Sequence, residues 1–309
     1  MSWKAWLPIL SWLQSAWIVL TIGIGLAGAI VVFSPKWSFL NDLVKYGKSQ
    51  SSERSIFHRS IEVPKKWFTH FYIYSTAILV SVTFYVWSCY HFDSLPAVMV
   101  KNFLVDLTAP YHRANVPELS VLLTLGCLVI HSIRRLFESL FLSVYSNTKM
   151  NVLHYVVGYV HYALLPLTIL SEAPGFVNQF QKQSKWSDLT VYQLIGVALF
   201  FFASYSQHQC LSILAAMRRN YLGNITTYAH GIPVSGWFDY VSCPHFLFEI
   251  LIYVSLYLTL NLSHRLWAYV VLFVVVNQVL AALITHTWYK EKYKHMYPAS
   301  RKALIPYVL

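Results

Sequence analysis

Charged residues are scarce in this chain of 309 residues, at 11% of the sequence, whereas a soluble globular domain has roughly 25%. Only 12 of them are Asp or Glu, against 23 Lys and Arg, and 57% of all residues are hydrophobic. No polar segment is long enough to form a separate soluble domain. These shortages exclude a disordered chain, a coiled coil and an ordinary soluble enzyme. The composition predicts an integral membrane protein.

Motifs for several common kinds of site are missing as well. Cys89, Cys127, Cys210 and Cys243 are widely spaced without a CxxC pattern, and the 13 His form no HExxH. A disulfide scaffold and a metal site are therefore not expected. The sequence GIGLAG at 23–28 has the GxGxxG spacing but lies inside an apolar run of membrane length, and GxxxxGK[ST] is absent, so a nucleotide would bind without a Rossmann domain or P-loop. In a membrane protein the net charge of +11 indicates orientation and anionic lipids or cofactors, and not nucleic acid.

Apolar runs of the length of a membrane span, about 20 residues, recur along the chain. We predict seven membrane-spanning helices, at 15–33, 68–88, 117–133, 152–171, 190–206, 246–262 and 266–284. The first run is longer than the apolar core of a cleaved signal peptide, so we interpret it as a retained anchor. The third run continues into RRLFESLFLSVY, which indicates one long helix that leaves the membrane at Arg134.

The distribution of Lys and Arg predicts the orientation. Seventeen of the 23 lie in the loops that follow the first, third, fifth and seventh predicted spans, and six lie in the remaining loops and the N-terminus. Basic loops stay in the cytosol. We therefore expect a lumenal N-terminus and a cytosolic C-terminus.

Ionisable side chains inside spans are costly and are functional candidates. Glu249 lies early in the sixth span, one helical turn after His245. It either contacts a ligand at the cytosolic mouth, or makes an interhelical hydrogen bond, or is a protonated structural residue. His131, Arg134, Arg135 and Glu138 recur at helical spacing and form one polar stripe, which either anchors the helix at the membrane surface or belongs to a site.

Two further polar clusters fall on the same predicted side. Arg218 and Arg219 follow the fifth span and suit lipid head groups or a phosphate ligand. Aromatic and basic residues alternate in the C-terminal segment 286–309, as in an interfacial helix or a nucleotide cradle. The convergence of all four clusters predicts one polar site at the cytosolic mouth of an apolar helix bundle.

Four segments together resemble a known family. They are VPKKWFTHFYIYS at 63–75, HSIRRLFESLFLSVYSN at 131–147, GWFDYVSCPHFLFE at 236–249 and HTWYKEKYKHMYPASRKALIPYVL at 286–309. In this order they resemble the steroid 5α-reductase family, and most closely its polyprenal reductase branch. The resemblance covers about residues 60–309. It implies one membrane-embedded reductase domain over 1–309, with an N-terminal anchor and polar loop at 1–60 and the catalytic core at 61–309.

The resemblance also implies an all-α bundle of seven transmembrane helices with cytosolic cofactor-binding loops, in the endoplasmic reticulum membrane. The enzyme would be an NADPH-dependent oxidoreductase acting on a CH–CH group. Its branch reduces the α-isoprene double bond of polyprenal towards dolichol, the lipid carrier of N-glycosylation. The expected partners are a long-chain polyprenyl lipid and the bilayer, with side activity on 3-oxo-4-ene steroids left open.

Cofactor-binding roles carry over from the resemblance residue by residue. Glu249 matches the family carboxylate on the nicotinamide carboxamide, and His245 stands where the family has Asn. Arg218 matches an Arg on the cofactor phosphates. The complete set of expected cofactor-binding residues is Arg135, Asn147, Arg218, Tyr240, His245, Glu249, His286 and Tyr289.

The catalytic groups of the family transfer less directly. Ser132 stands where steroid-reducing members have a Tyr, and Phe71, next to His70, stands where they have a Glu. These replacements predict a different clamp for the substrate carbonyl. Our candidates for that clamp or for the proton donor are His70, Tyr72 and His131; the alternative for each is a packed, hydrogen-bonded helix residue.

Two other functions remain open at this point. One is a membrane methyltransferase of the isoprenylcysteine type, which would bind S-adenosylmethionine. The other is a non-enzymatic receptor or transporter with seven spans. The chain has no Asp-Arg-Tyr or Asn-Pro-x-x-Tyr signature, and no repeat of two halves like that of many transporters.

Overall fold

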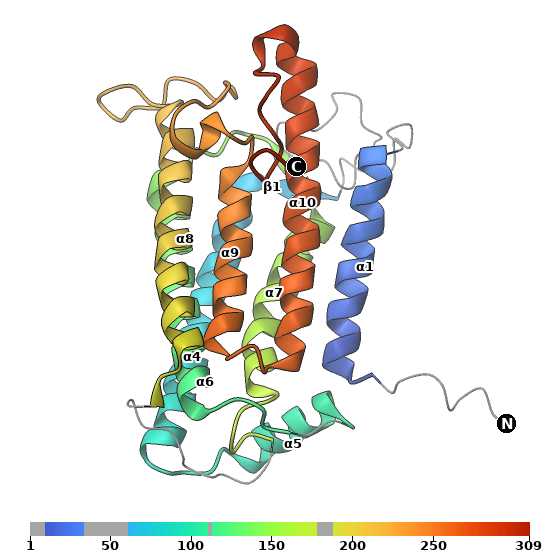
Figure 1. Ribbon diagram of the computed structural model, residues 1–309, viewed down its shortest axis with the longest axis vertical. Helices are drawn as coiled ribbons and strands as arrows, with labels where there is room; N and C mark the ends of the chain where they lie inside the picture. The colour runs from blue at the N-terminus through green and yellow to red at the C-terminus, as the bar shows by residue number, and fades with distance from the viewer. Residues whose placement is uncertain (1–9, 34–60, 111–112, 178–187) are drawn as a thin grey trace, which may run out of the picture.

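Long apolar helices make up most of the chain in the computed structural model, which describes residues 10–33, 61–110, 113–177 and 188–309 (Figure 1). The long helices are α1 (Trp12–Phe33), α4 (Phe68–His91), α6 (Glu118–Phe137), α7 (Val152–Leu170), α8 (Val191–Ala216), α9 (Pro244–Thr259) and α10 (Arg265–Tyr293). Each predicted span coincides with one of them, so the predicted helix positions are confirmed. The helices α8 and α10 continue beyond the expected ends.

Within the described residues, five helical segments are long and apolar enough to cross a membrane: Trp12–Phe33, Lys65–His91, Glu118–Leu142, Val152–Leu170 and Arg265–Met296. The helix α9 is apolar but shorter, and α8 carries the polar run 204–209 in its second half. The fold is that of an integral membrane protein built from helices. Seven crossings stay a prediction, and residues 34–60 of the predicted polar loop lie outside the described residues.

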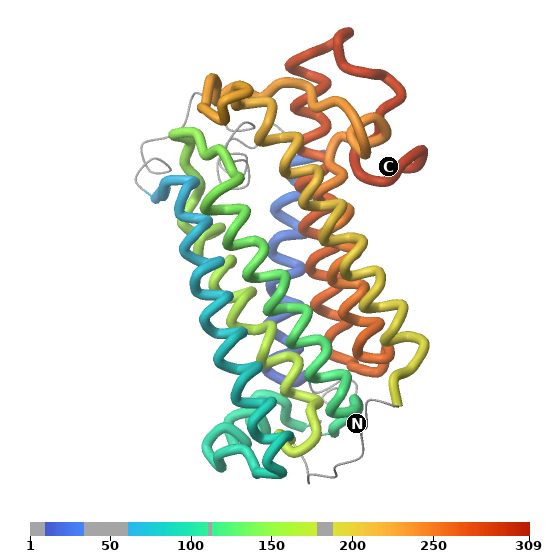
Figure 2. Tube along the Cα trace, turned by 90° about the vertical axis from the view of Figure 1, so that its left-hand side faces the viewer, coloured from blue at the N-terminus to red at the C-terminus, as the bar shows by residue number. Residues whose placement is uncertain are grey.

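Segments far apart in sequence meet at one end of the helices. The strand β1 (Glu62–Pro64) pairs antiparallel with β2 (Lys149–Asn151), which ties the start of α4 to the start of α7. The turn after α8 and the C-terminal segment lie at this same end, whereas the short helix α5 (Val98–Thr108) lies at the other (Figures 1 and 2). The described parts of the loops predicted to share one side are thus together, and we call this end the loop end.

Local sequence signals explain where several helices begin. Thr190 and Gln193 form a reciprocal capping box at the start of α8, which satisfies otherwise unpaired backbone N–H groups. The Asn151 side chain accepts a hydrogen bond from the Leu153 N–H at 2.8 Å at the start of α7. Pro244 occupies the first turn of α9, where its missing N–H costs nothing.

Small residues set how closely neighbouring helices approach. A Cβ on Gly196 of α8 would lie 2.8 Å from the Ser255 carbonyl oxygen and 2.8 Å from the Thr259 nitrogen of α9. These are backbone atoms, so only glycine permits this contact. Gly28 plays a similar part between α1 and Leu280 of α10. The close packing of α8 on α9 places the polar run of α8 beside Glu249.

Candidate active site

The polar stripe on α6 is held together by Glu138. The helix α6 continues directly into a π-helical turn, η4 (Glu138–Leu142), so the expected extension past Arg134 is present. Arg134 Nη1 donates to Glu138 Oε1 at 2.7 Å, and Arg135 Nη1 donates to Oε2 at 2.5 Å. The Glu138 side chain is only 3% exposed. One buried carboxylate therefore fixes two guanidinium groups, and each keeps its Nη2 for another partner.

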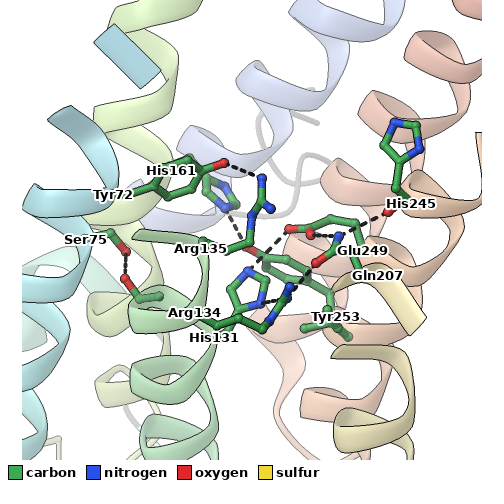
Figure 3. A network of polar contacts seen from close by, with 12 residues as sticks. Tyr72, Ser75, His131, Arg134, Arg135, His161, Gln207, His245, Glu249 and Tyr253 are labelled. Atoms are coloured by element: carbon green, nitrogen blue, oxygen red, sulfur yellow. Dashed lines mark hydrogen bonds and ion pairs between the residues drawn. The ribbon is translucent and has the colours of Figure 1, made fainter. Parts of the chain in front are cut away.

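The second nitrogen of Arg134 leads to Glu249 through Gln207. Arg134 Nη2 donates to Gln207 Oε1 at 2.6 Å, and Gln207 Nε2 donates to Glu249 Oε2 at 2.6 Å. The same Gln207 nitrogen donates to the His245 carbonyl oxygen at 3.1 Å. Three helices, α6, α8 and α9, thus meet in one relay (Figure 3). Glu249 has the interhelical hydrogen bond that a carboxylate inside a span requires.

His131 completes the surroundings of Glu249. Its Nδ1 lies 3.1 Å from Arg134 Nη2, which has only hydrogens to offer, so Nδ1 is the acceptor and a neutral ring carries its proton on Nε2. This Nε2 faces Glu249 Oε1 at 3.6 Å, too long for a hydrogen bond. The Oε1 atom of Glu249 therefore keeps accepting capacity for a ligand. With two Arg and two Glu, the network is balanced in charge.

Tyr72 on α4 is the partner of the other guanidinium. Arg135 Nη2 donates to the Tyr72 hydroxyl oxygen at 2.9 Å, and its Cζ lies 5.1 Å from the centre of the Tyr72 ring. Because Arg has no acceptor, the hydroxyl hydrogen of Tyr72 is not used in this contact. A phenol held in this way has a proton to donate and a cation beside its oxygen.

Three residues that the sequence interpretation missed lie around this network. Tyr253 of α9 and His161 of α7 are joined by a hydrogen bond of 2.8 Å between the hydroxyl and Nε2. The ring centres of Tyr162 and Tyr72 lie 6.1 Å apart. A signal for His161 existed, because it is an ionisable residue within an apolar span. Tyrosine in an apolar run carries no comparable signal.

Arg218 belongs to a separate group at the loop end. Its Nη1 donates to the Val144 carbonyl oxygen at 2.7 Å, and its Nη2 contacts the His230 ring at 2.6 Å. Partial burial lowers the pKa of the Arg218 guanidinium from its usual value, although an arginine remains cationic. The contacts hold the cation against the turn that follows η4, and so close to the end of the α6 stripe.

His286 and Tyr289 belong to a third group, which includes the C-terminal segment. The Ser242 hydroxyl contacts His286 Nδ1 at 2.6 Å and the Tyr297 hydroxyl at 2.5 Å. Tyr289 stacks on Tyr297 with ring centres 5.5 Å apart. Burial raises the pKa of the Tyr297 hydroxyl. Arg301 is buried and donates to the Pro233 carbonyl oxygen at 3.0 Å, which ties the segment to the loop before α9.

The remaining predicted residues lie outside the buried network. His70 is exposed and contacts the Tyr155 hydroxyl at 3.0 Å on the outer face of α4. The His245 side chain points away from Glu249, and its carbonyl oxygen accepts the hydrogen bond from Gln207 (Figure 3). Tyr240 and Asn147 are exposed near the loop end. Of the catalytic candidates, the structure therefore brings Tyr72 and His131 together with Arg135 and Glu249, but not His70.

The described residues contain no group of three or more His, Cys, Asp or Glu positioned to hold a metal ion. What they do contain is a charge-balanced polar network buried among apolar helices, with acceptor and donor capacity left for a ligand. This fold defines an integral membrane protein, and the buried network is its candidate active site.

Comparison with known proteins identifies the family. The family model described as 3-oxo-5-alpha-steroid 4-dehydrogenase matches residues 148–309. The chain is 38% identical over 296 residues to the polyprenal reductase of Caenorhabditis elegans, a match that covers 94% of this chain and 95% of the relative. It is 37% identical to that of Danio rerio, over 97% of this chain and 99% of the relative. For the polyprenal reductase of Homo sapiens the identity is 33%, over 96% and 95%.

The chain belongs to this 3-oxo-5-alpha-steroid 4-dehydrogenase family, the steroid 5α-reductases. The predicted family resemblance is thereby confirmed. Members of the family are oxidoreductases that reduce carbon–carbon double bonds, and the chain is an enzyme of this class. The methyltransferase and receptor or transporter interpretations do not agree with this membership.

Proposed function

We propose that the chain is an NADPH-dependent polyprenal reductase of the endoplasmic reticulum membrane, with seven membrane-spanning helices and a cytosolic loop end. It would reduce the α-isoprene double bond of a long polyprenal and so supply dolichol for protein N-glycosylation. The observation that carries the proposal is the Tyr72–Arg135 pair beside Glu249, in a chain 38% identical to a polyprenal reductase. The apolar helices around this pair suit a substrate that arrives from the bilayer.

The residues present fit NADPH. Glu249 Oε1 keeps accepting capacity, because the His131 Nε2 that faces it is 3.6 Å away, and an amide N–H of the nicotinamide carboxamide is a suitable donor. Arg218 lies at the loop end, where it contacts the turn that follows η4, and arginine binds phosphate in a bidentate manner. When bound, NADPH supplies the hydride that adds to the β-carbon of the conjugated aldehyde.

Tyr72 is the clamp for the aldehyde oxygen in this proposal. Its hydroxyl hydrogen is available to donate, and Arg135 stabilises the hydroxyl oxygen as negative charge moves towards it. Hydrogen bonds with a charged partner are roughly twice as strong as neutral ones, and a positioned acid contributes about 10²–10⁴-fold to the rate. Ser132 is occupied by Ser75 and Thr76, at 2.8 and 2.9 Å, so it is a poorer candidate for this role.

The proposal is tested by product analysis. Purified protein is incubated with NADPH and, separately, with polyprenal, polyprenol and a 3-oxo-4-ene steroid, and the lipid products are analysed by mass spectrometry. We expect NADPH oxidation and a product heavier by two hydrogens with polyprenal. No turnover of any of the three would refute the proposal. A parallel thermal shift with S-adenosylmethionine tests the methyltransferase alternative.

The cofactor role of Glu249 is tested by Glu249→Ala. Loss of a hydrogen bond to a charged group costs about 1.5–3 kcal/mol, which corresponds to roughly 10- to 150-fold weaker NADPH binding. Binding is measured by nucleotide fluorescence in detergent. The matched control is Glu291→Ala, which removes an exposed carboxylate from α10 and should leave binding unchanged. Wild-type affinity in Glu249→Ala would remove Glu249 from the cofactor site.

A further inference from the structure

We infer that Tyr253 donates the proton to the α-carbon of the substrate and that His161 positions it, an inference that rests on the proposed function. Tyr253 is 1% exposed and lies one helical turn after Glu249 on α9. Its hydroxyl lies 2.8 Å from His161 Nε2. Neither residue belongs to a motif that carries the family resemblance.

The tautomer of His161 follows from its surroundings. His161 Nδ1 is buried, and among the described residues it has no hydrogen-bond partner. A buried N–H without an acceptor is rarer in proteins than an acceptor without a donor. The ring proton therefore lies on Nε2, which donates to the Tyr253 oxygen. The hydroxyl hydrogen of Tyr253 is then not used in this contact and is available to a ligand.

Aromatic packing fixes both rings. The His161 ring stacks on Phe273 with centres 5.3 Å apart and meets Trp17 edge-on at 5.7 Å. The Tyr253 ring lies nearly parallel to Trp267, with an interplanar angle of 15°. A hydroxyl on such a ring has a defined direction, which a proton transfer requires.

Two phenols thus face the same region from opposite helices. Tyr72 comes from α4 and Tyr253 from α9, and both reach the neighbourhood of Arg135 and Glu249 (Figure 3). Tyr253 is near enough to Tyr72, Arg135 and Glu249 to interact with them electrostatically. Because Tyr253 follows Glu249 by one turn, it lies beside the expected position of the nicotinamide ring. We therefore assign the carbonyl oxygen to Tyr72 and the α-carbon to Tyr253.

The step balances in atoms and electrons. A hydride from the nicotinamide donor forms a C–H bond at the β-carbon, and the electron pair of the double bond moves to give an enolate whose oxygen is held by Tyr72. The O–H bond of Tyr253 then breaks as a C–H bond forms at the α-carbon. The phenolate that remains on Tyr253 accepts the His161 Nε2 hydrogen bond, and water restores its proton after the product leaves.

The test uses Tyr253→Phe, with Tyr257→Phe as the control, because Tyr257 lies one turn further along α9 and is partly buried. In Tyr253→Phe we expect kcat for polyprenal to fall about 100-fold or more, with KM within about threefold of wild type and NADPH binding unchanged. Reactions in D2O give a second readout. Wild type should place deuterium at one of the two α-carbon positions, whereas Tyr253→Phe should distribute it over both, because solvent protonates the enolate without a preferred face.

His161 is tested by two replacements. His161→Gln retains an N–H donor and should keep a larger part of kcat than His161→Leu, which has none. Equal losses in the two variants, with wild-type deuterium stereochemistry in both, would indicate a packing role and overturn the positioning role. A wild-type enzyme that leaves polyprenal unchanged refutes the proposed function. An active wild type whose Tyr253→Phe variant keeps kcat and stereospecific labelling refutes the assignment of Tyr253.

Discussion

Replacing Glu138 with Gln removes one negative charge from the site and leaves the shape of the side chain nearly unchanged. Gln has nearly the same size, so no cavity forms. The carboxylate accepts from Arg134 at 2.7 Å, from Arg135 at 2.5 Å and from His208 at 2.9 Å. An amide supplies only one acceptor oxygen, and its NH2 group faces a guanidinium that also has only hydrogens to offer.

The size of the effect follows from burial. Removing one partner of a buried ion pair costs about 3–5 kcal/mol. The Glu138 side chain is 3% exposed, but those of Arg134 and Arg135 retain 17% and 19%, so water still solvates them partly. We therefore expect the lower limit, about 3 kcal/mol, which is roughly a 150-fold smaller folding equilibrium constant. Activity should fall too, because Arg135 is no longer fixed against Tyr72.

The assay is reversible unfolding of the purified protein in detergent, followed by tryptophan fluorescence. Glu291→Gln, an exposed carboxylate on α10, is the matched control and should unfold like wild type. Turnover of polyprenal is measured well below the unfolding transition of each variant. A Glu138→Gln protein within about 0.5 kcal/mol of wild type, as for an ordinary surface change, and with wild-type kcat would refute the argument.

Three further predictions concern packing, catalysis and orientation. Gly196→Ala should destabilise the protein by about 1–3 kcal/mol, because its Cβ would meet backbone atoms at 2.8 Å. Gly126→Ala is the control, because a Cβ there meets nothing within 4 Å. Equal unfolding curves for the two variants would contradict this prediction. Tyr72→Phe should lower kcat about 100-fold with unchanged NADPH affinity in a fluorescence titration, and an unchanged kcat would exclude the carbonyl clamp. Asn224 lies in an exposed sequon at the loop end and should carry no glycan if that end is cytosolic. A mass shift on glycosidase treatment would contradict the predicted orientation.

The sequence alone located the helices and marked much of the site. Apolar runs of membrane length predicted the positions of the long described helices, which are α1, α4, α6, α7, α8, α9 and α10. The spacing of His131, Arg134, Arg135 and Glu138 predicted one stripe, because residues three and four apart share a helix face. Glu249 stood out because a carboxylate in an apolar span must find a donor. These inferences concern single helices, whose geometry is fixed by local spacing.

The partners of these residues were decided only by the tertiary structure. Arg134 donates a hydrogen bond to Gln207 on α8, and Arg135 donates one to Tyr72 on α4. Nothing in the spacing along α6 predicts which arginine meets which partner. The pair of His161 and Tyr253 joins α7 to α9, and only packing brings these helices together. Local spacing determines which face a side chain occupies, whereas close contacts between distant helices determine what that face meets. The chemistry of this protein depends on those contacts.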